Sequence, residues 1–168
     1  MSKLQEFKKL QEAVSTFANT HKDEIFADAL AGAFAVESGI KAILINGYTP
    51  GFNDGDPCTH TQYSVIEADE LKDHVSGSEE MIAFLLGFES EAAMYSELNE
   101  KDLDTEEALE GLDLGDFPYE VTREVNSHLD GVEDVLHEVM GTDWQILAVR
   151  MADGSIKTMT NEYYDCGY

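Results

Sequence analysis

Four side chains capable of chemistry stand close together in the segment 53–60, namely Asp54, Asp56, Cys58 and His60. Carboxylate oxygens are the ligands that hard cations prefer, and thiolate and imidazole groups are typical zinc ligands. Residues two apart on a strand point the same way, so Cys58 and His60 also fit a nucleophile and its general base. One hypothesis for this chain is therefore a small enzyme, or a protein that binds a metal or another ligand through this loop.

The spacing of these residues does not match a known metal or catalytic motif. The segment lacks the Asp-x-Asp-x-Asp-Gly order of a calcium loop, and the stretch 102–106 begins like one but has Glu107 where glycine is needed. Cys58, His60 and Cys166 would give three zinc ligands, yet no Cys-x-x-Cys pair supports them. Two cysteines are too few for a disulfide framework, and whether they pair stays open. We expect turn chemistry here, with no metal, no cofactor and no catalytic residue.

A second and much larger set of candidate functional side chains consists of carboxylates distributed along the chain. The chain has 35 acidic and 10 basic residues, a net charge of −25, and residues 64–168 hold 27 of the acids. A surface that is acidic only for solubility, or for growth in high salt, would spread this charge evenly, whereas here the charge is concentrated after residue 63. The large negative charge of this chain repels phosphates and attracts basic proteins. The sequence therefore disfavours direct nucleic-acid binding and predicts a basic partner protein, such as a nucleic-acid enzyme.

The carboxylates expected to bind that partner recur along helical segments. There they can stand in for the phosphates of a DNA duplex, which carry one charge per ~1.7 Å of axis. Leucines spaced among the acids favour short ordered helices over a tail. Lys101 is the only base between Glu89 and Glu120. The candidate residues are Glu97, Glu100, Asp102, Asp104, Glu106, Glu107, Glu110, Asp113, Glu124, Asp130, Glu133 and Asp134.

The elements that position these groups follow from hydrophobic periodicity and turn signals. Strands are expected at 41–46 and 59–68, joined by a long glycine- and proline-rich tip, and a second hairpin at 143–151 and 155–163 turns at Asp153-Gly154. Helices are expected over residues 2–20, 23–36, 78–87, 90–98, 104–112 and 118–140. The prediction is one α+β domain over residues 1–168. Two antiparallel hairpins form a roughly four-stranded sheet, which packs with N-terminal helices and a helical acidic insertion.

Hydropathy gives an expectation about the compartment. No apolar run reaches the ~18 residues that a membrane span needs, and no basic-then-apolar signal peptide opens the chain. We therefore expect a cytoplasmic protein that does not bind membranes.

The string Tyr-Thr-Pro-Gly-Phe-Asn-Asp-Gly-Asp-Pro-Cys, residues 48–58, resembles a segment of small bacteriophage proteins of uncharacterised function. Those segments carry a bulky or aromatic residue at the position of Gly51. The resemblance implies a phage origin and the cytoplasm of an infected host cell, and it assigns no chemistry to these residues. By composition alone, the acidity resembles that of phage proteins that mimic DNA and inhibit host enzymes, which implies evasion of host defence. A phage structural or assembly component is a further alternative.

Overall fold

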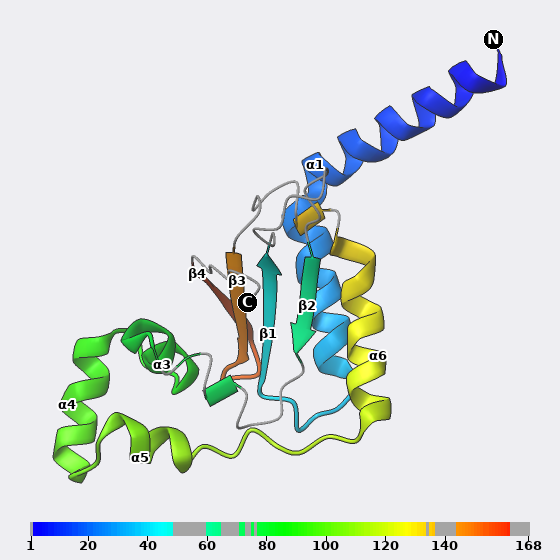
Figure 1. Ribbon diagram of the computed structural model, residues 1–168. Coiled ribbons are helices and arrows are strands. Elements are labelled where there is room, and N and C mark those ends of the chain that lie inside the picture. The colour runs from blue at the N-terminus through cyan, green and yellow to red at the C-terminus, as the bar shows by residue number, and fades with distance from the viewer. Residues whose placement is uncertain are drawn as a thin grey trace, which may run out of the picture.

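The computed structural model describes residues 2–48, 60–64, 71–72, 75, 77–133, 135–136 and 144–161, with only the backbone at 48 and 60–64. The fold combines helices with an antiparallel sheet, so the α+β prediction is confirmed (Figure 1). The helices are α1 (Lys3–Ala35), α3 (Glu79–Leu85), α4 (Glu91–Lys101), α5 (Thr105–Glu110), α6 (Tyr119–Leu129) and the 3-10 helix η1 (Asp130–Val132). The strands are β1 (Ala42–Tyr48), β2 (His60–Ser64), β3 (Trp144–Arg150) and β4 (Ile156–Asn161).

The sheet has the strand order β2-β1-β3-β4, and every neighbouring pair is antiparallel. β3 lies between β1 and β4, with Ile45 opposite Ile146 and Leu147 opposite Met159. A strand in this position is covered on both faces, which explains why both faces of β3 are apolar. Its central position in the sheet thus accounts for its apolar sequence.

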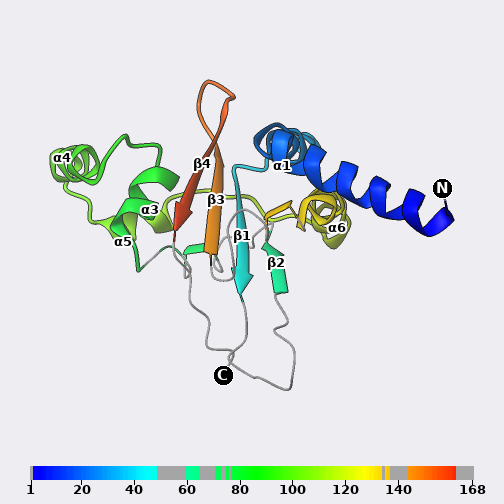
Figure 2. The same ribbon diagram turned by 90° about the horizontal axis from the view of Figure 1, so that it is seen from above.

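Helices cover both faces of the sheet, so the molecule has three layers (Figure 2). Alternation along the strands sends Leu44 and Leu147 to one face, where they pack with α3, α4 and α5. Ile45 and Ile146 point to the other face, where they pack with α1 and α6. The two apolar clusters thus place the acidic helices α4 and α5 on the opposite side of the sheet from α6.

Polar side chains cap the starts of α1, α3 and α4. The Ser2 hydroxyl accepts a hydrogen bond from the backbone N–H of Gln5 at 3.3 Å, and the Gln5 side chain accepts one from the backbone N–H of Ser2 at 2.9 Å. Ser78 and Ser90 accept equivalent bonds at the starts of α3 and α4. Each cap satisfies an N–H group that the first helical turn leaves without a partner.

The break expected between the helices 2–20 and 23–36 is present, because α1 departs from helical geometry at a kink at His21 (φ −116°, ψ 16°). One other expected helix differs from the structure. The helix expected over 118–140 ends at Leu129, and its chain continues as the 3-10 turn that contains Gly131. Glycine disfavours the α-helix relative to alanine, which is consistent with this change of geometry.

One buried polar pair crosses the sheet. Asn46 and Gln145 are 2% and 3% exposed, and the Gln145 Nε2 group donates to Asn46 Oδ1 at 3.0 Å. A buried acceptor that loses its donor bears the full cost of desolvation. We expect Gln145→Met to lower the free energy of unfolding by about 2 kcal/mol in urea denaturation. In the double variant Asn46→Leu, Gln145→Met neither group needs a partner, and most of the loss should be recovered. Additive losses would contradict this account of the pair.

Candidate functional site

The loop site proposed from the sequence lies outside the described residues. Asp54, Asp56, Cys58 and Cys166 are not described, and His60 is described only as a backbone position at the start of β2, paired with Tyr48. Within the described ranges, no group of three or more His, Cys, Asp or Glu side chains is placed to hold a metal ion. Likewise, no helix among these residues is long and apolar enough to cross a membrane.

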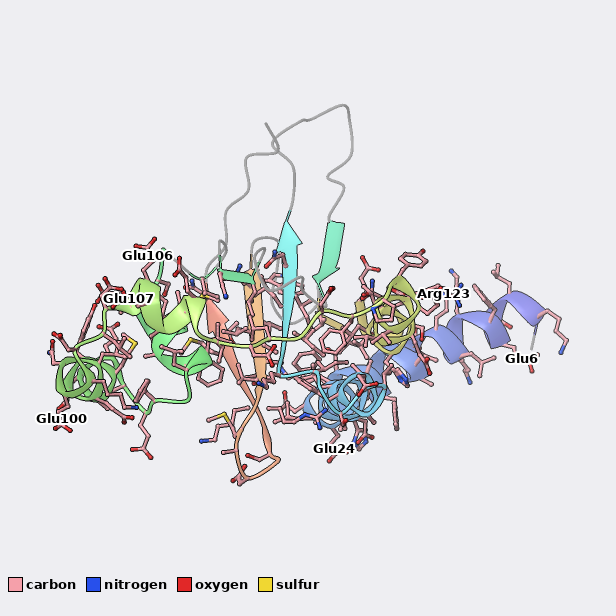
Figure 3. All side chains as sticks on the ribbon, turned by 90° about the horizontal axis from the view of Figure 1, so that it is seen from below. Glu6, Glu24, Glu100, Glu106, Glu107 and Arg123 are labelled. Carbon is pink, nitrogen blue, oxygen red and sulfur yellow. The ribbon has the colours of Figure 1, made fainter. Side chains whose placement is uncertain are left out.

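The carboxylates proposed to bind a partner fall into two groups on opposite sides of the sheet. Eight belong to α4, α5 and the turns beside them, whereas Glu124, Asp130 and Glu133 belong to α6, η1 and the residue that follows. Asp134 lies outside the described residues. Figure 3 shows Glu100, Glu106 and Glu107 gathered at the end of the molecule far from Arg123 of α6. The structure therefore corrects the expectation of one acidic face formed by all twelve residues.

We call the larger group the α4–α5 acidic surface, and all its members are exposed. It consists of Glu97, Glu100, Asp102, Asp104, Glu106, Glu107, Glu110 and Asp113. Within 97–113 the only base is Lys101, whose Nζ atom lies 2.7 Å from Glu97 Oε1. Both side chains of this ion pair are about half exposed, so the pair adds little to stability. The surface therefore keeps a strongly negative charge.

Some of these carboxylates also hold the local backbone in place. Asp104 Oδ1 accepts the Glu107 backbone N–H at 2.8 Å, and Glu107 Oε2 accepts the Asp104 N–H at 3.1 Å. This capping box starts α5. Asp113 Oδ1 accepts the backbone N–H of Gly115 at 3.1 Å. Because Asp104, Glu107 and Asp113 have structural roles, a binding test should leave them unchanged.

The turn between α4 and α5 depends on Asp102. This residue ends α4 in the left-handed conformation (φ 54°, ψ 42°), and the backbone N–H of Leu103 donates to the Leu98 carbonyl at 3.0 Å. That bond closes the helix as in a Schellman motif, where glycine is usual and aspartate is tolerated. Lysines fix the other end of the segment, because Lys41 Nζ donates to the Asp113 carbonyl at 2.7 Å and Lys72 Nζ to the Glu110 carbonyl at 3.3 Å.

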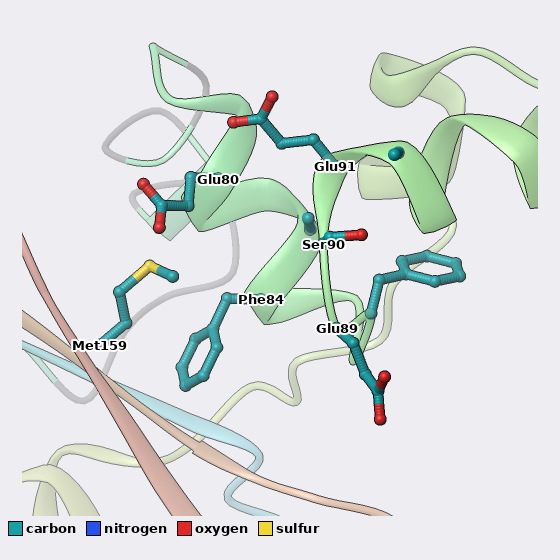
Figure 4. A pocket seen from close by; sticks show the side chains of 9 residues that line it. Glu80, Phe84, Glu89, Ser90, Glu91 and Met159 are labelled. Atoms are coloured by element: carbon teal, nitrogen blue, oxygen red, sulfur yellow. The ribbon is translucent and has the colours of Figure 1, made fainter.

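A pocket of about 400 Å3 opens in the same helical layer, between α3, the start of α4 and β4. Its apolar lining includes Phe84, Phe88 and Met159, and Glu80, Glu89 and Glu91 stand around it (Figure 4). Such a pocket suits a lysine or arginine side chain, because an apolar wall covers the stem and carboxylates meet the cationic head. The sequence did not reveal this pocket, because Met159 lies far along the chain from the helices that supply the other lining residues.

The pKa of Tyr95 of α4 responds to the carboxylates of α3 and α4. The hydrogen bond between its hydroxyl and Glu79 raises the pKa of Tyr95 above its usual range, with burial and the charges of Glu79 and Glu91 as further causes. Removing the Glu79 charge makes the tyrosinate easier to form. We therefore expect Glu79→Gln to lower the pKa of Tyr95, measured by NMR titration of its ring carbons. An unchanged pKa would contradict this assignment of the cause.

Comparisons of the chain with protein-family models, with curated proteins and with solved structures found no match.

Proposed function

We propose that this chain is a non-enzymatic bacteriophage protein that binds a basic host or phage protein through the α4–α5 acidic surface. The partner is a nucleic-acid-binding enzyme, and the carboxylates occupy the site that otherwise holds phosphates. The chain then acts as an inhibitor or sequestering protein in the cytoplasm of the host cell. The observation that carries this proposal is the exposure of eight carboxylates in one segment of two short, capped helices.

The charge of this layer supports a basic partner. Residues 77–117, which contain α3, α4 and α5, hold 13 acidic residues and one basic residue. Charge of one sign over a surface speeds the encounter with an oppositely charged protein and excludes partners of like charge. A phosphate-binding site is rich in lysine and arginine and therefore complements it.

Local order also favours binding. Caps at Ser90 and Asp104 begin α4 and α5, and the left-handed Asp102 sets the angle of the chain between them. A surface that is already ordered loses less conformational entropy on association than a flexible acidic tail would lose. This difference favours a specific complex over diffuse attraction of many basic proteins.

The pocket beside α4 adds an anchor to the charged surface. Interfaces gain most of their binding energy from a few side chains that insert into pockets, and arginine is frequent among them. An arginine of the partner can cover Phe84 and Phe88 with its stem while its guanidinium faces Glu80 or Glu91. The proposal therefore places one partner arginine in this pocket and further basic residues along α4 and α5.

Affinity capture from a host lysate tests the proposed function. The protein is immobilised and the lysate applied at about 50 mM and at about 300 mM salt, because screening weakens contacts between exposed charges. A stoichiometric nucleic-acid-binding protein that is retained at the lower salt and released at the higher salt is the expected result. Capture of no protein at either salt, or of a partner insensitive to salt, would contradict the proposal.

A further inference from the structure

The first part of α1 forms an arm that projects from the three-layered body (Figure 1). We define the arm as residues 3–20, which precede the bend at His21. Residues 2–17 are all exposed. Five large apolar side chains follow one stripe of the arm and are 55–69% exposed, namely Leu4, Phe7, Leu10, Val14 and Phe17. Most helices are stabilised by packing of their apolar face, and an apolar stripe of this kind marks a contact surface.

We propose that a second copy of this chain covers the stripe, and that the two arms pair as antiparallel helices. Phe7, Leu10, Val14 and Phe17 are separated by three, four and three residues. This is the a/d spacing of a coiled coil, with Phe7 at an a position. The intervals are the same in either direction, so the stripe matches its own reversed copy, as a two-fold axis requires. Phe7 then faces Phe17 of the second copy, and Leu10 faces its Val14.

The charges of the arm suit this partner. Beside the four a and d residues, the e positions are occupied by Leu4, Gln11 and Ala18, and the g positions by Glu6, Ala13 and Thr20. Glu6 is the only charged residue among them, so a second arm meets little like charge at the seam. Lys8, Lys9 and Glu12 occupy the b, c and f positions, which point away from the partner helix in a coiled coil.

The charge of the body selects the antiparallel direction. The arm holds three lysines and two glutamates and is slightly positive, so the whole of the negative net charge lies beyond it. A parallel pair would place two acidic bodies side by side. An antiparallel pair places them at opposite ends of arms about 27 Å long, given a rise of about 1.5 Å per residue. That distance is several Debye lengths of about 8 Å at physiological salt, so the repulsion is screened.

The size of the stripe sets the expected affinity. Each of the five side chains exposes roughly 100 Å2, about half of the area of a large apolar side chain. Two copies thus contribute on the order of 1,000 Å2, which is the smallest area expected of a specific interface. The dissociation constant of the dimer should therefore be in the micromolar range.

Sedimentation equilibrium of the full chain tests this inference. From about 1 to about 200 µM, the wild type should pass from monomer to dimer. Phe7→Gln, Val14→Gln should weaken association at least tenfold, whereas the outer-face control Lys8→Gln, Glu12→Gln should match the wild type. The substituted side chains are exposed, so both variants should keep the wild-type melting temperature. A monomer throughout this range, or equal association of the two variants, would overturn the inference.

Cysteine cross-linking tests the direction of the arms. Leu10→Cys and Val14→Cys are made separately in a Cys58→Ser, Cys166→Ser background, because a disulfide requires Cα atoms about 4.4–6.8 Å apart. Antiparallel arms predict a mixed disulfide when the two variants are combined and little cross-linking of either alone. Efficient cross-linking of each variant with itself would overturn the antiparallel arrangement. Flotation of monomeric protein with phosphatidylcholine or phosphatidylglycerol vesicles would assign the stripe to a lipid surface and overturn the dimer.

Discussion

Gly47→Ala should lower the free energy of unfolding by about 3 kcal/mol, the upper part of the usual range for overpacking a core. Gly47 of β1 lies opposite Trp144 of β3, and a Cβ atom at Gly47 would overlap with the indole ring of Trp144. Trp144 is 2% exposed, so its ring has no free space in which to move. The variant must therefore shift the strand or displace the indole from the core.

Thermal unfolding followed by tryptophan fluorescence measures this effect, because Trp144 is the only tryptophan. For a chain of this size a loss of about 3 kcal/mol lowers Tm by roughly 6–12 °C. Gly131→Ala is the matched control, since a Cβ there meets nothing within 4 Å and alanine favours helical geometry. If both variants melt within about 2 °C of the wild type, the close approach of the Trp144 indole to Gly47 has no effect on stability, and the prediction is wrong.

The second large effect concerns binding. Glu100→Lys, Glu106→Lys, Glu110→Lys should weaken association with the captured basic partner by at least about 100-fold, or about 2.7 kcal/mol. The triple variant changes the charge of the α4–α5 acidic surface by six units, and each reversal removes an exposed attraction of roughly 0.5 kcal/mol and adds a repulsion of about the same size. Glu100 and Glu110 lie in the last turns of α4 and α5, where lysine is favourable for the helix dipole. The fold should therefore survive the change.

A control variant with the same net charge distinguishes the effect of the α4–α5 acidic surface from the effect of total charge. Asp28→Lys, Glu124→Lys, Asp130→Lys alters exposed positions of α1, α6 and η1, on the other side of the sheet. Because it too gains six units, general attraction to a basic protein would fall equally in both triple variants. The proposal expects the control to bind within about threefold of the wild type, measured by titration calorimetry, since distant surface charges are largely screened. Equal losses would contradict a localised binding surface.

Several elements could be predicted because their signals are local. The helices expected over 78–87, 90–98 and 104–112 correspond to α3, α4 and α5, and each of these begins at a polar cap. The hairpin expected at 143–151 and 155–163 is also present, because β3 pairs with β4. Local periodicity was sufficient for these inferences because each depends only on residues a few positions apart.

The features that were missed depend on contacts between distant parts of the chain. Hydrophobic periodicity predicted the helix over 2–20, yet it could not show that the body leaves the apolar stripe of this helix exposed. The order of helices along the chain likewise did not show that Glu124 and Glu106 lie on opposite sides of the sheet. The pocket bounded by Phe84 and Met159 forms only when α3 packs against β4. In each case tertiary packing, rather than local propensity, decides the outcome.

The most direct test of the central claim is a competition experiment with the captured partner. A fluorescent DNA duplex is bound to the partner, the protein is added, and the anisotropy of the duplex is followed at low salt. We expect one equivalent of wild-type protein to displace the duplex, and Glu100→Lys, Glu106→Lys, Glu110→Lys not to displace it at the same concentration. A stable ternary complex of partner, duplex and protein, or equal displacement by the triple variant, would contradict the claim that the α4–α5 acidic surface occupies a phosphate-binding site.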